Sequence, residues 1–170
     1  IEVACADYGG WRQQGVKLDY LVLNLSPAQI VEDLEIYLLE QCKNNGLTAD
    51  SIILDFNEQK FIVSSTEQRN ILRSLQARGF RVCVDDFGSG RASLSCLLQC
   101  PVNAIKIDRA FTSTCIESIE SQNMVSGVLA LASKLDMLVV AEGVETQEEY
   151  ERLRELGCTH MQGFYFSEPL

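Results

Sequence analysis

The chain has 170 residues, of which 46% are hydrophobic and 22% are charged, and its formal net charge is −10 at pH 7. This is the composition of an ordinary globular protein with enough apolar residues for one core, so we expect a single domain over residues 1–170. The acidic excess disfavours binding to a nucleic acid polymer, which depends on basic residues. Because no apolar run reaches the roughly 18 residues of a membrane-spanning helix, we expect no membrane segment.

The cysteine pattern points to a reducing compartment. There are seven cysteines, an odd number, and no CxxC pair occurs among them. Free thiols used as small buried apolar residues fit this pattern better than a zinc site or a disulfide framework. Since the first residues also lack the pattern of a signal peptide, we expect a cytoplasmic location.

Six strand-like segments follow one another along the chain as continuous apolar runs rather than alternating ones. Such runs are typical of strands that are buried on both faces. The predicted strands are Tyr20–Leu25, Ser51–Phe56, Arg81–Asp86, Ala104–Ile107, Leu138–Ala141 and Met161–Phe166.

Helical patterns lie between most of these strands. A capping box with Pro27 at its first position opens the first, whose apolar face holds Ile30, Leu34 and Leu38. A second capping box at Thr146 opens the last helix, which Gly157 ends. The other predicted helices are Thr66–Arg78, ended by Gly79, a shorter candidate at Leu94–Leu98, and Gln122–Leu135.

Alternation of strands and helices over the whole length predicts an α/β fold with a parallel sheet. Two arrangements fit this pattern, an open doubly wound sheet and a (β/α) barrel. A GxGxxG motif after the first strand would favour the open sheet, and none occurs there. Gly88-Ser89-Gly90 follows the third strand, and this short motif alone is weak evidence, so both arrangements stay open.

Polar residues stand at or near the C-terminal end of every predicted strand. In a parallel barrel these ends open on one face, where active sites lie. A single polar residue after a strand is usually a cap or turn residue, but here all six ends are polar. The residues are Asn24, Asp55, Asp85 with Asp86, Lys106 with Asp108, Glu142 and Gln162.

This set of side chains predicts a site for divalent cations. All members except Lys106 offer oxygen ligands, which suit Mg²⁺, Mn²⁺ or Ca²⁺, and two such ions can support phosphoester hydrolysis. Lys106 would deprotonate a water or hold charge on the phosphate. Successive side chains on a strand point to opposite faces, so Asp85 and Asp86 can share a site only where the strand bends, and Gly88 and Gly90 would permit that bend.

Several motifs together resemble the EAL domain family. They are "LNLSPAQI" (residues 23–30), "VDDFGSGRASLSCL" (84–97), "PVNAIKIDRAF" (101–111), "VVAEGVET" (139–146) and "MQGFYFSEPL" (161–170), in the family's order and spacing. The resemblance implies a modified TIM barrel and hydrolysis of the bacterial second messenger cyclic di-GMP to linear pGpG, with Mg²⁺ or Mn²⁺ as cofactor.

The resemblance also implies roles for single positions. Asn24, Asp85, Asp86 and Glu142 match metal ligands, and Lys106 matches the lysine proposed to assist the attacking water. Gln162 matches a glutamine that orients water or substrate. Glu145 matches a second acid, and Glu58 matches a glutamate thought to steady the loop after the acidic pair.

Two departures from the family pattern stand out. Asp55 replaces a metal-ligand glutamate, and its carboxylate falls back by about 1.5 Å because aspartate is one methylene shorter. Mg²⁺ tolerates little deviation from its preferred distances, so we expect a weakened metal site. The E-A-L tripeptide is also absent, and the family places it on a strand ahead of the segment at Asn24.

The chain therefore holds about six of the eight strands of a barrel. Three explanations are open: a longer protein that supplies the remainder, a partner chain that completes the barrel, or a shortened regulatory domain. We expect these 170 residues alone to be inactive. The alternative to an enzyme is a catalytically degenerate domain that binds cyclic di-GMP or a protein. Homodimerisation through the loop after the acidic pair, and fused sensor or GGDEF-type domains, are further expectations from the resemblance.

Overall fold

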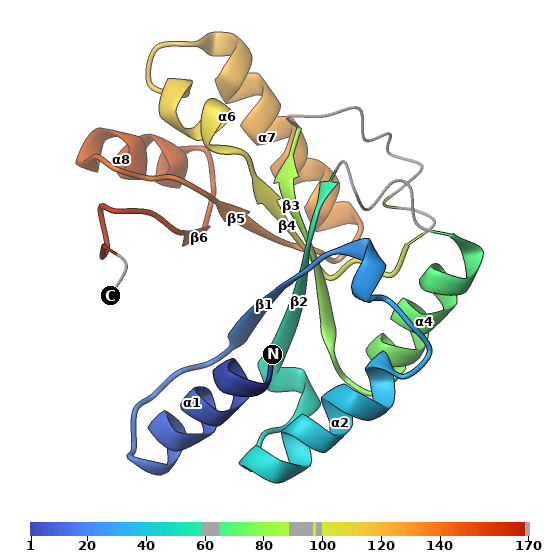
Figure 1. Ribbon diagram of the computed structural model, residues 1–170. Helices are drawn as coiled ribbons and strands as arrows, with labels where there is room; N and C mark the ends of the chain where they lie inside the picture. The colour runs from blue at the N-terminus through green and yellow to red at the C-terminus, as the bar shows by residue number, and fades with distance from the viewer. Residues whose placement is uncertain (59–64, 89–96, 98–99, 169–170) are drawn as a thin grey trace. The chain divides into compact units, whose positions relative to one another are not determined.

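The computed structural model describes residues 1–58, 65–88, 97 and 100–168 (Figure 1). The chain divides into two compact units, Ile1–Cys83 with Ser93–Val102 and Val84–Ala92 with Asn103–Leu170. The strands form a sheet in chain order, β1-β2-β3-β4-β5-β6. The pairs β1·β2, β4·β5 and β5·β6 are all parallel, which confirms the predicted α/β class.

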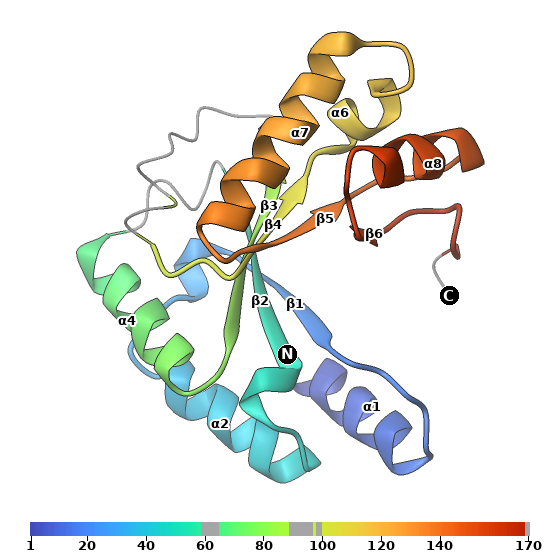
Figure 2. The same cartoon turned by 180° about the vertical axis from the view of Figure 1, so that it is seen from behind.

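The first unit packs helices against the pair β1·β2. Leu54 and Phe56 of β2 are fully buried, as are Leu72 and Leu75 of α4. Helices α1 and α2 lie side by side (Figures 1 and 2), and a Cβ atom at Gly9 would lie 2.5 Å from the carbonyl oxygen of Asn45. The elements are α1 (Glu2–Gln13), β1 (Leu21–Leu25), η1 (Pro27–Gln29), α2 (Leu34–Asn45), η2 (Ala49–Ser51), β2 (Ile52–Asn57) and α4 (Thr66–Ala77).

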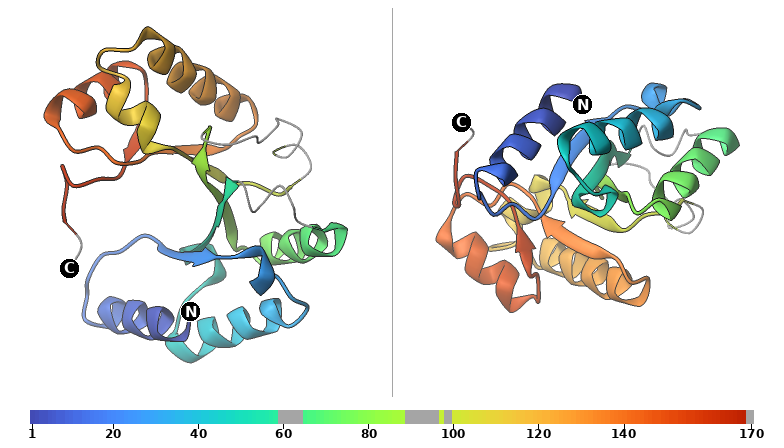
Figure 3. Two further views of the ribbon diagram at one scale, coloured as in Figure 1. Left: turned by 45° about the horizontal axis from the view of Figure 1, so that its top comes forward. Right: turned by 90° about the horizontal axis from the view of Figure 1, so that it is seen from below.

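The second unit begins within β3 (Arg81–Phe87), whose first three residues belong to the first unit. Lys106 of β4 pairs in register with Val140 of β5. Helices α6 and α7 lie against each other (Figure 3). The remaining elements are β4 (Ala104–Ile107), α6 (Arg109–Thr114), α7 (Ile119–Lys134), β5 (Leu138–Ala141), α8 (Gln147–Glu155) and β6 (His160–Met161).

The predicted strands agree with β1 to β5 to within one residue at either end. The sixth prediction, Met161–Phe166, is wrong beyond Met161, because the chain turns there and the amide of Phe166 donates to the carbonyl of Gly163 at 3.1 Å. The apolar run reflects an aromatic cluster, in which the ring of Tyr165 stacks on that of Tyr150 with centroids 5.5 Å apart.

The helix starts show where local signals misled. The capping box at Ser26 is present, with the Ser26 amide donating to Gln29 Oε1 at 2.8 Å, but it opens the short 3₁₀ helix η1. The α-helix α2 begins only at Leu34, so the predicted helix start is wrong, although Leu34 and Leu38 are buried as expected. Helix α7 starts at Ile119, three residues before the predicted Gln122, because Ser118 caps it.

Burial follows the predicted two-sided pattern only in part. Every residue of β4 is buried, whereas β1 alternates, with Leu23 and Leu25 buried and Val22 exposed. The six described cysteines are buried free thiols, as expected, and Cys96 lies outside the described residues. Of the predicted Leu94–Leu98 helix only Leu97 is described, and it is helical. In the part of the chain that the structure describes, no helix is both long enough and apolar enough to cross a bilayer.

Helix α8 depends on the capping box that the sequence predicts. The amide of Glu149 donates to Thr146 Oγ1 at 3.2 Å, and Glu149 Oε2 accepts from the amide of Thr146 at 3.1 Å. We expect Thr146→Ala to lower the free energy of unfolding by about 1 kcal/mol, because one helix-end amide loses its acceptor. Thr146→Ser keeps the hydroxyl and should unfold at nearly the wild-type denaturant concentration. Chemical denaturation followed by circular dichroism checks both, and equal losses in the two variants would contradict this role of the cap.

Candidate metal centre

The two adjacent carboxylates at the end of β3 are brought together by an unusual backbone conformation. Asp86 has φ of 57°, in the left-handed region, and its amide donates to Asp85 Oδ1 at 2.9 Å. Aspartate is among the few residues that tolerate this region. The chain therefore bends at Asp86 itself, two residues before Gly88, the first of the two glycines that the sequence suggested for this purpose.

Gly88 continues the bend for a different reason. Its φ is 98°, and a Cβ atom at this position would lie 2.7 Å from Met124 Cε and 3.0 Å from Phe111 Cε2. Glycine is required both for the conformation and for the close approach of α6 and α7. Gly90, the second predicted bend residue, lies outside the described residues.

Three carboxylates of the second unit form a cluster. One oxygen atom from each of Asp85, Asp86 and Glu142 lies within 4.8 Å of the other two, and all three residues are partly buried. Glu142 follows β5 directly, and its amide donates to the carbonyl of Ile107 at the end of β4 at 3.1 Å. The predicted convergence of acids at strand ends is thus present for the strands of this unit.

Burial is the main influence on the acidity of Glu142. Desolvation raises the pKa of its carboxyl group to about 7, the ammonium of Lys106 opposes the rise, and the charge of Asp85 adds to it. The ordinary pKa of a glutamate is near 4.3. Burial therefore disfavours the ionised form of Glu142, and a positive charge close to this carboxylate favours it.

Lys106 is the cation that the chain itself supplies. The residue is 9% exposed on β4, and its Nζ atom lies 3.1 Å from Glu142 Oε1 and 3.8 Å from Asp85 Oδ1. The ammonium of Lys106 thus lies beside two of the three carboxylates of the cluster. Carboxylate oxygens at this spacing suit a hard divalent cation, and the donor set therefore fits Mg²⁺, Mn²⁺ or Ca²⁺.

Gln162 lies just after β6, and its main chain bridges the segment that carries Glu142. Its amide donates to the carbonyl of Ala141 at 2.8 Å, and its carbonyl accepts from the amide of Val144 at 3.0 Å. Gln162 itself is exposed. The main chain of Gln162 therefore lies beside the segment 141–144 that contains Glu142, and the role of its side chain stays a prediction.

Two predicted metal ligands belong to the first unit. Asn24 of β1 and Asp55 of β2 are register partners on adjacent parallel strands, so their side chains stand on the same face. Asp55 is 2% exposed, whereas Asn24 is exposed. Glu58, which follows β2, is 1% exposed, but residues 89–93 of the loop that it is predicted to steady lie outside the described residues.

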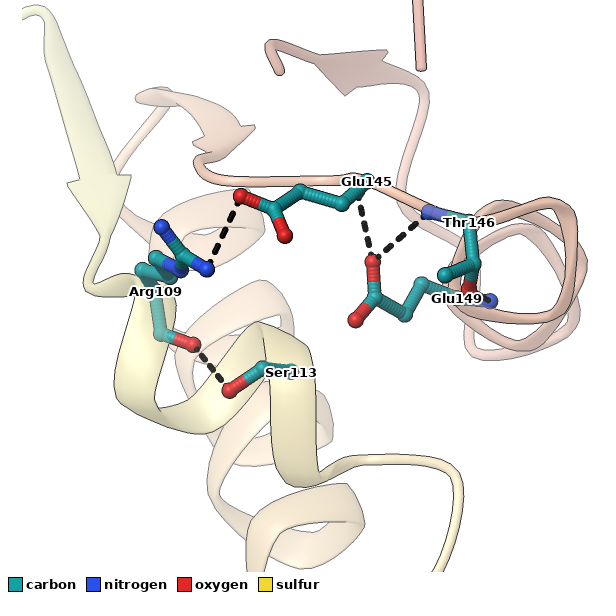
Figure 4. A network of polar contacts seen from close by, with 5 residues as sticks. All are labelled: Arg109, Ser113, Glu145, Thr146 and Glu149. Carbon is teal, nitrogen blue, oxygen red and sulfur yellow. Dashed lines mark hydrogen bonds and ion pairs between the residues drawn. The ribbon is translucent and has the colours of Figure 1, made fainter. Parts of the chain in front are cut away.

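Glu145, the predicted second acid, has a cationic partner on α6. Arg109 Nη2 lies 2.8 Å from Glu145 Oε1 (Figure 4). Arg109 is not among the residues that the sequence pattern predicted for the site, although it stands within "AIKIDRAF", three residues after Lys106. Its position in a motif that carries Lys106 was the available signal, but a pair separated by 36 positions in the chain cannot be inferred from periodicity.

Comparison with known proteins supports the resemblance. Cyclic di-GMP phosphodiesterase NbdA of Pseudomonas aeruginosa is 33% identical over 172 residues, which cover 98% of this chain and 22% of NbdA. The EAL domain of Mycobacterium smegmatis DcpA has a TM-score of 0.93 and 35% identity, covering 99% of this chain and 77% of that chain. The manganese and cyclic di-GMP complex of Klebsiella pneumoniae BlrP1 has a TM-score of 0.90 and 30% identity, covering 99% and 43%.

The chain spans about a fifth of the length of NbdA and of the oxygen sensor protein DosP of Escherichia coli, another curated relative. The family model of the EAL domain matches residues 1–169, which is nearly the whole chain. The fold is accordingly the TIM-like fold of EAL domains, of which this chain contributes six strands. The chain belongs to the EAL domain family.

Proposed function

We propose that this domain hydrolyses cyclic di-GMP to linear pGpG with the help of Mg²⁺ or Mn²⁺. The observation that carries the proposal is the cluster of Asp85, Asp86 and Glu142, whose oxygens lie within 4.8 Å of one another. The name of NbdA and the manganese and cyclic di-GMP complex of BlrP1 support the substrate and the metal.

In this proposal the three carboxylates of the cluster hold the metal. A bound divalent cation would polarise a phosphoryl oxygen and lower the pKa of a bound water. That Asn24 and Asp55 are further ligands is a prediction from the family resemblance. The backbone at Asp86 is bent without a metal, with φ of 57°. The Asp86 amide donates to Asp85 Oδ1 at 2.9 Å and so holds the Asp85 carboxylate in place for a metal.

Lys106 supplies positive charge where the phosphodiester gains negative charge. With Nζ 3.1 Å from Glu142 Oε1, the ammonium is held at the edge of the carboxylate cluster and can donate to a phosphoryl oxygen. A water oxygen bonds to phosphorus, the bond from phosphorus to one ribose oxygen breaks, and that ribose oxygen takes up a proton. One water is consumed and one linear dinucleotide, pGpG, is released.

The wider setting of the domain is part of the proposal. We expect it to act in the cytoplasm, as a homodimer, within a protein that also carries sensor or GGDEF-type domains. The family often dimerises through the loop and helix after the acidic pair, and the segment at this place, residues 89–93, lies outside the described residues.

The first prediction from this proposal concerns the affinity for the metal without nucleotide. Asp85→Asn and Glu142→Gln each remove one ligand charge while nearly keeping side-chain size, and we expect each to weaken Mn²⁺ binding at least tenfold. Isothermal titration calorimetry without nucleotide measures this affinity. Glu148→Gln, an exposed acid on α8, is the matched control and should bind Mn²⁺ as the wild type does. Equal affinities in all four proteins would contradict the assigned ligands.

The second prediction tests turnover. In the full-length protein with Mg²⁺ or Mn²⁺, we expect Lys106→Met to lower kcat for pGpG formation by a factor of about 10² to 10⁴. Loss of a proton-transfer group usually has an effect of this size, and loss of a charge-stabilising group has a similar one. Lys134→Met, at the exposed end of α7, is the control. Chromatography of the nucleotides follows the reaction. Tight cyclic di-GMP binding by the wild type without any pGpG would favour the degenerate receptor.

The third prediction concerns Asp55. Its presence where the family has a metal-ligand glutamate favours the receptor alternative. If its shorter side chain limits the metal site, Asp55→Glu should raise Mn²⁺ affinity or kcat severalfold. Asp55→Asn should do neither, which separates a longer ligand from a general effect at this buried position. An unchanged affinity in Asp55→Glu, with the fold intact by circular dichroism, would remove Asp55 from the metal ligands.

A further inference from the structure

Arg109 lies on the same short segment as Lys106. It is the first residue of α6, which begins two residues after β4 ends. Asp108 caps this helix by accepting from the amide of Ala110 at 2.7 Å, and Ser113 Oγ donates to the carbonyl of Arg109 at 2.9 Å. The main chain at Arg109 is therefore fixed with respect to the strand that carries Lys106.

The aliphatic part of the Arg109 side chain supports the turn that follows Glu142. Gly143 has φ of 68°, and a Cβ atom at this position would lie 2.8 Å from both Cβ and Cδ of Arg109. No side chain fits between the two residues. The peptide immediately after Glu142 thus rests on the stem of Arg109.

The guanidinium of Arg109 contacts the same segment again, two residues further on. Its Nη2 atom lies 2.8 Å from Glu145 Oε1 (Figure 4). Glu149 of α8 contacts the main chain of the same segment. Its Oε2 atom accepts from the amide of Glu145 at 2.6 Å and from that of Thr146 at 3.1 Å. The segment from Glu142 to Thr146 is therefore fixed between α6 and α8.

The ion pair between Arg109 and Glu145 is too exposed to contribute much to the free energy of unfolding. The side chains of Arg109 and Glu145 are 60% and 35% exposed, and ion pairs with such exposure add little to the stability of a fold. A carboxylate that must meet a metal, in contrast, needs its supporting contacts, since loss of such contacts commonly weakens metal binding by 10- to 100-fold. Arg109 approaches the segment that carries Glu142 at two places, the main chain at Gly143 and the side chain of Glu145.

We propose that Arg109 is a positioning residue of the metal centre, which holds Glu142 at its distance from Lys106 through the stem contact with Gly143 and the ion pair with Glu145. The proposal rests on the proposed function, in that Glu142 is taken to bind the metal. It assigns Glu145 to the support of the loop and not to the metal. Arg109 itself touches neither the metal nor the substrate in this assignment.

Mn²⁺ affinity measured without nucleotide tests the proposal independently of turnover. Arg109→Met keeps most of the stem and removes the charge, and we expect it to weaken Mn²⁺ binding by about tenfold. The matched control is Arg152→Met, because Arg152 Nη1 also forms an ion pair in this unit, 2.7 Å from Glu155 Oε2, with side chains 40% and 65% exposed. The control should leave Mn²⁺ affinity unchanged, while both variants unfold at similar denaturant concentrations.

A double-mutant cycle separates positioning from a general loss of charge. Glu145→Gln should weaken Mn²⁺ binding about as much as Arg109→Met does, and the double variant should be no worse than either single one. Arg109→Lys, which keeps the positive charge, should recover part of the affinity. In full-length protein that forms pGpG, Arg109→Met should lower kcat with little change in KM for cyclic di-GMP.

The outcomes are distinguishable. Wild-type Mn²⁺ affinity in Arg109→Met, additive losses in the cycle, or an equal loss in Arg152→Met would overturn the positioning role. If the wild type binds Mn²⁺ but forms no pGpG, the proposed function fails and the cycle on Mn²⁺ affinity still decides the role of Arg109. If Glu142→Gln leaves Mn²⁺ affinity unchanged, the premise that Glu142 is a ligand fails, and the positioning role fails with it.

Discussion

The repulsion among the carboxylates of Asp85, Asp86 and Glu142 is the constraint on which the second unit depends. Asp85, Asp86 and Glu142 place oxygens within 4.8 Å of one another, and the Nζ atom of Lys106 lies 3.1 Å from Glu142 and 3.8 Å from Asp85. Burial prevents water from screening the repulsion, as the pKa of Glu142 near 7 indicates. A cation bound by the cluster would therefore stabilise the folded unit as well as serve the reaction, because it binds the folded arrangement and not the unfolded chain.

Main-chain hydrogen bonds between neighbouring strand ends oppose this repulsion and hold the cluster together. The Glu142 amide donates to the carbonyl of Ile107, and the Gln162 amide donates to that of Ala141, so the ends of β4, β5 and β6 are linked in sequence. At β3 the left-handed conformation of Asp86 turns its side chain toward the same cluster. These main-chain bonds do not depend on the charge state of the carboxylates.

Much of this arrangement was predictable from the sequence. Buried parallel strands give long apolar runs, so β1 to β5 were placed to within a residue, and polar residues after such runs marked the cluster. The sixth strand was overestimated because exposed aromatic residues that stack on one another, such as Tyr165 on Tyr150, give the same apolar signal as a strand. The left-handed Asp86 and the contact of Arg109 with Gly143 were not predictable, because both depend on tertiary contacts between distant segments.

Three of the four acids between residues 142 and 149 illustrate why residue type alone does not assign a role. Glu142 faces Lys106 and the aspartates, Glu145 is paired with Arg109, and Glu149 accepts two main-chain amides at the start of α8. Glu145 is thus engaged by a guanidinium and Glu149 by two amides outside the cluster, whereas Glu142 shares the Lys106 ammonium with Asp85 and lies beside both aspartates. The separation of these roles follows from the turn at Gly143, whose positive φ sends Glu142 toward the cluster and Glu145 toward α6.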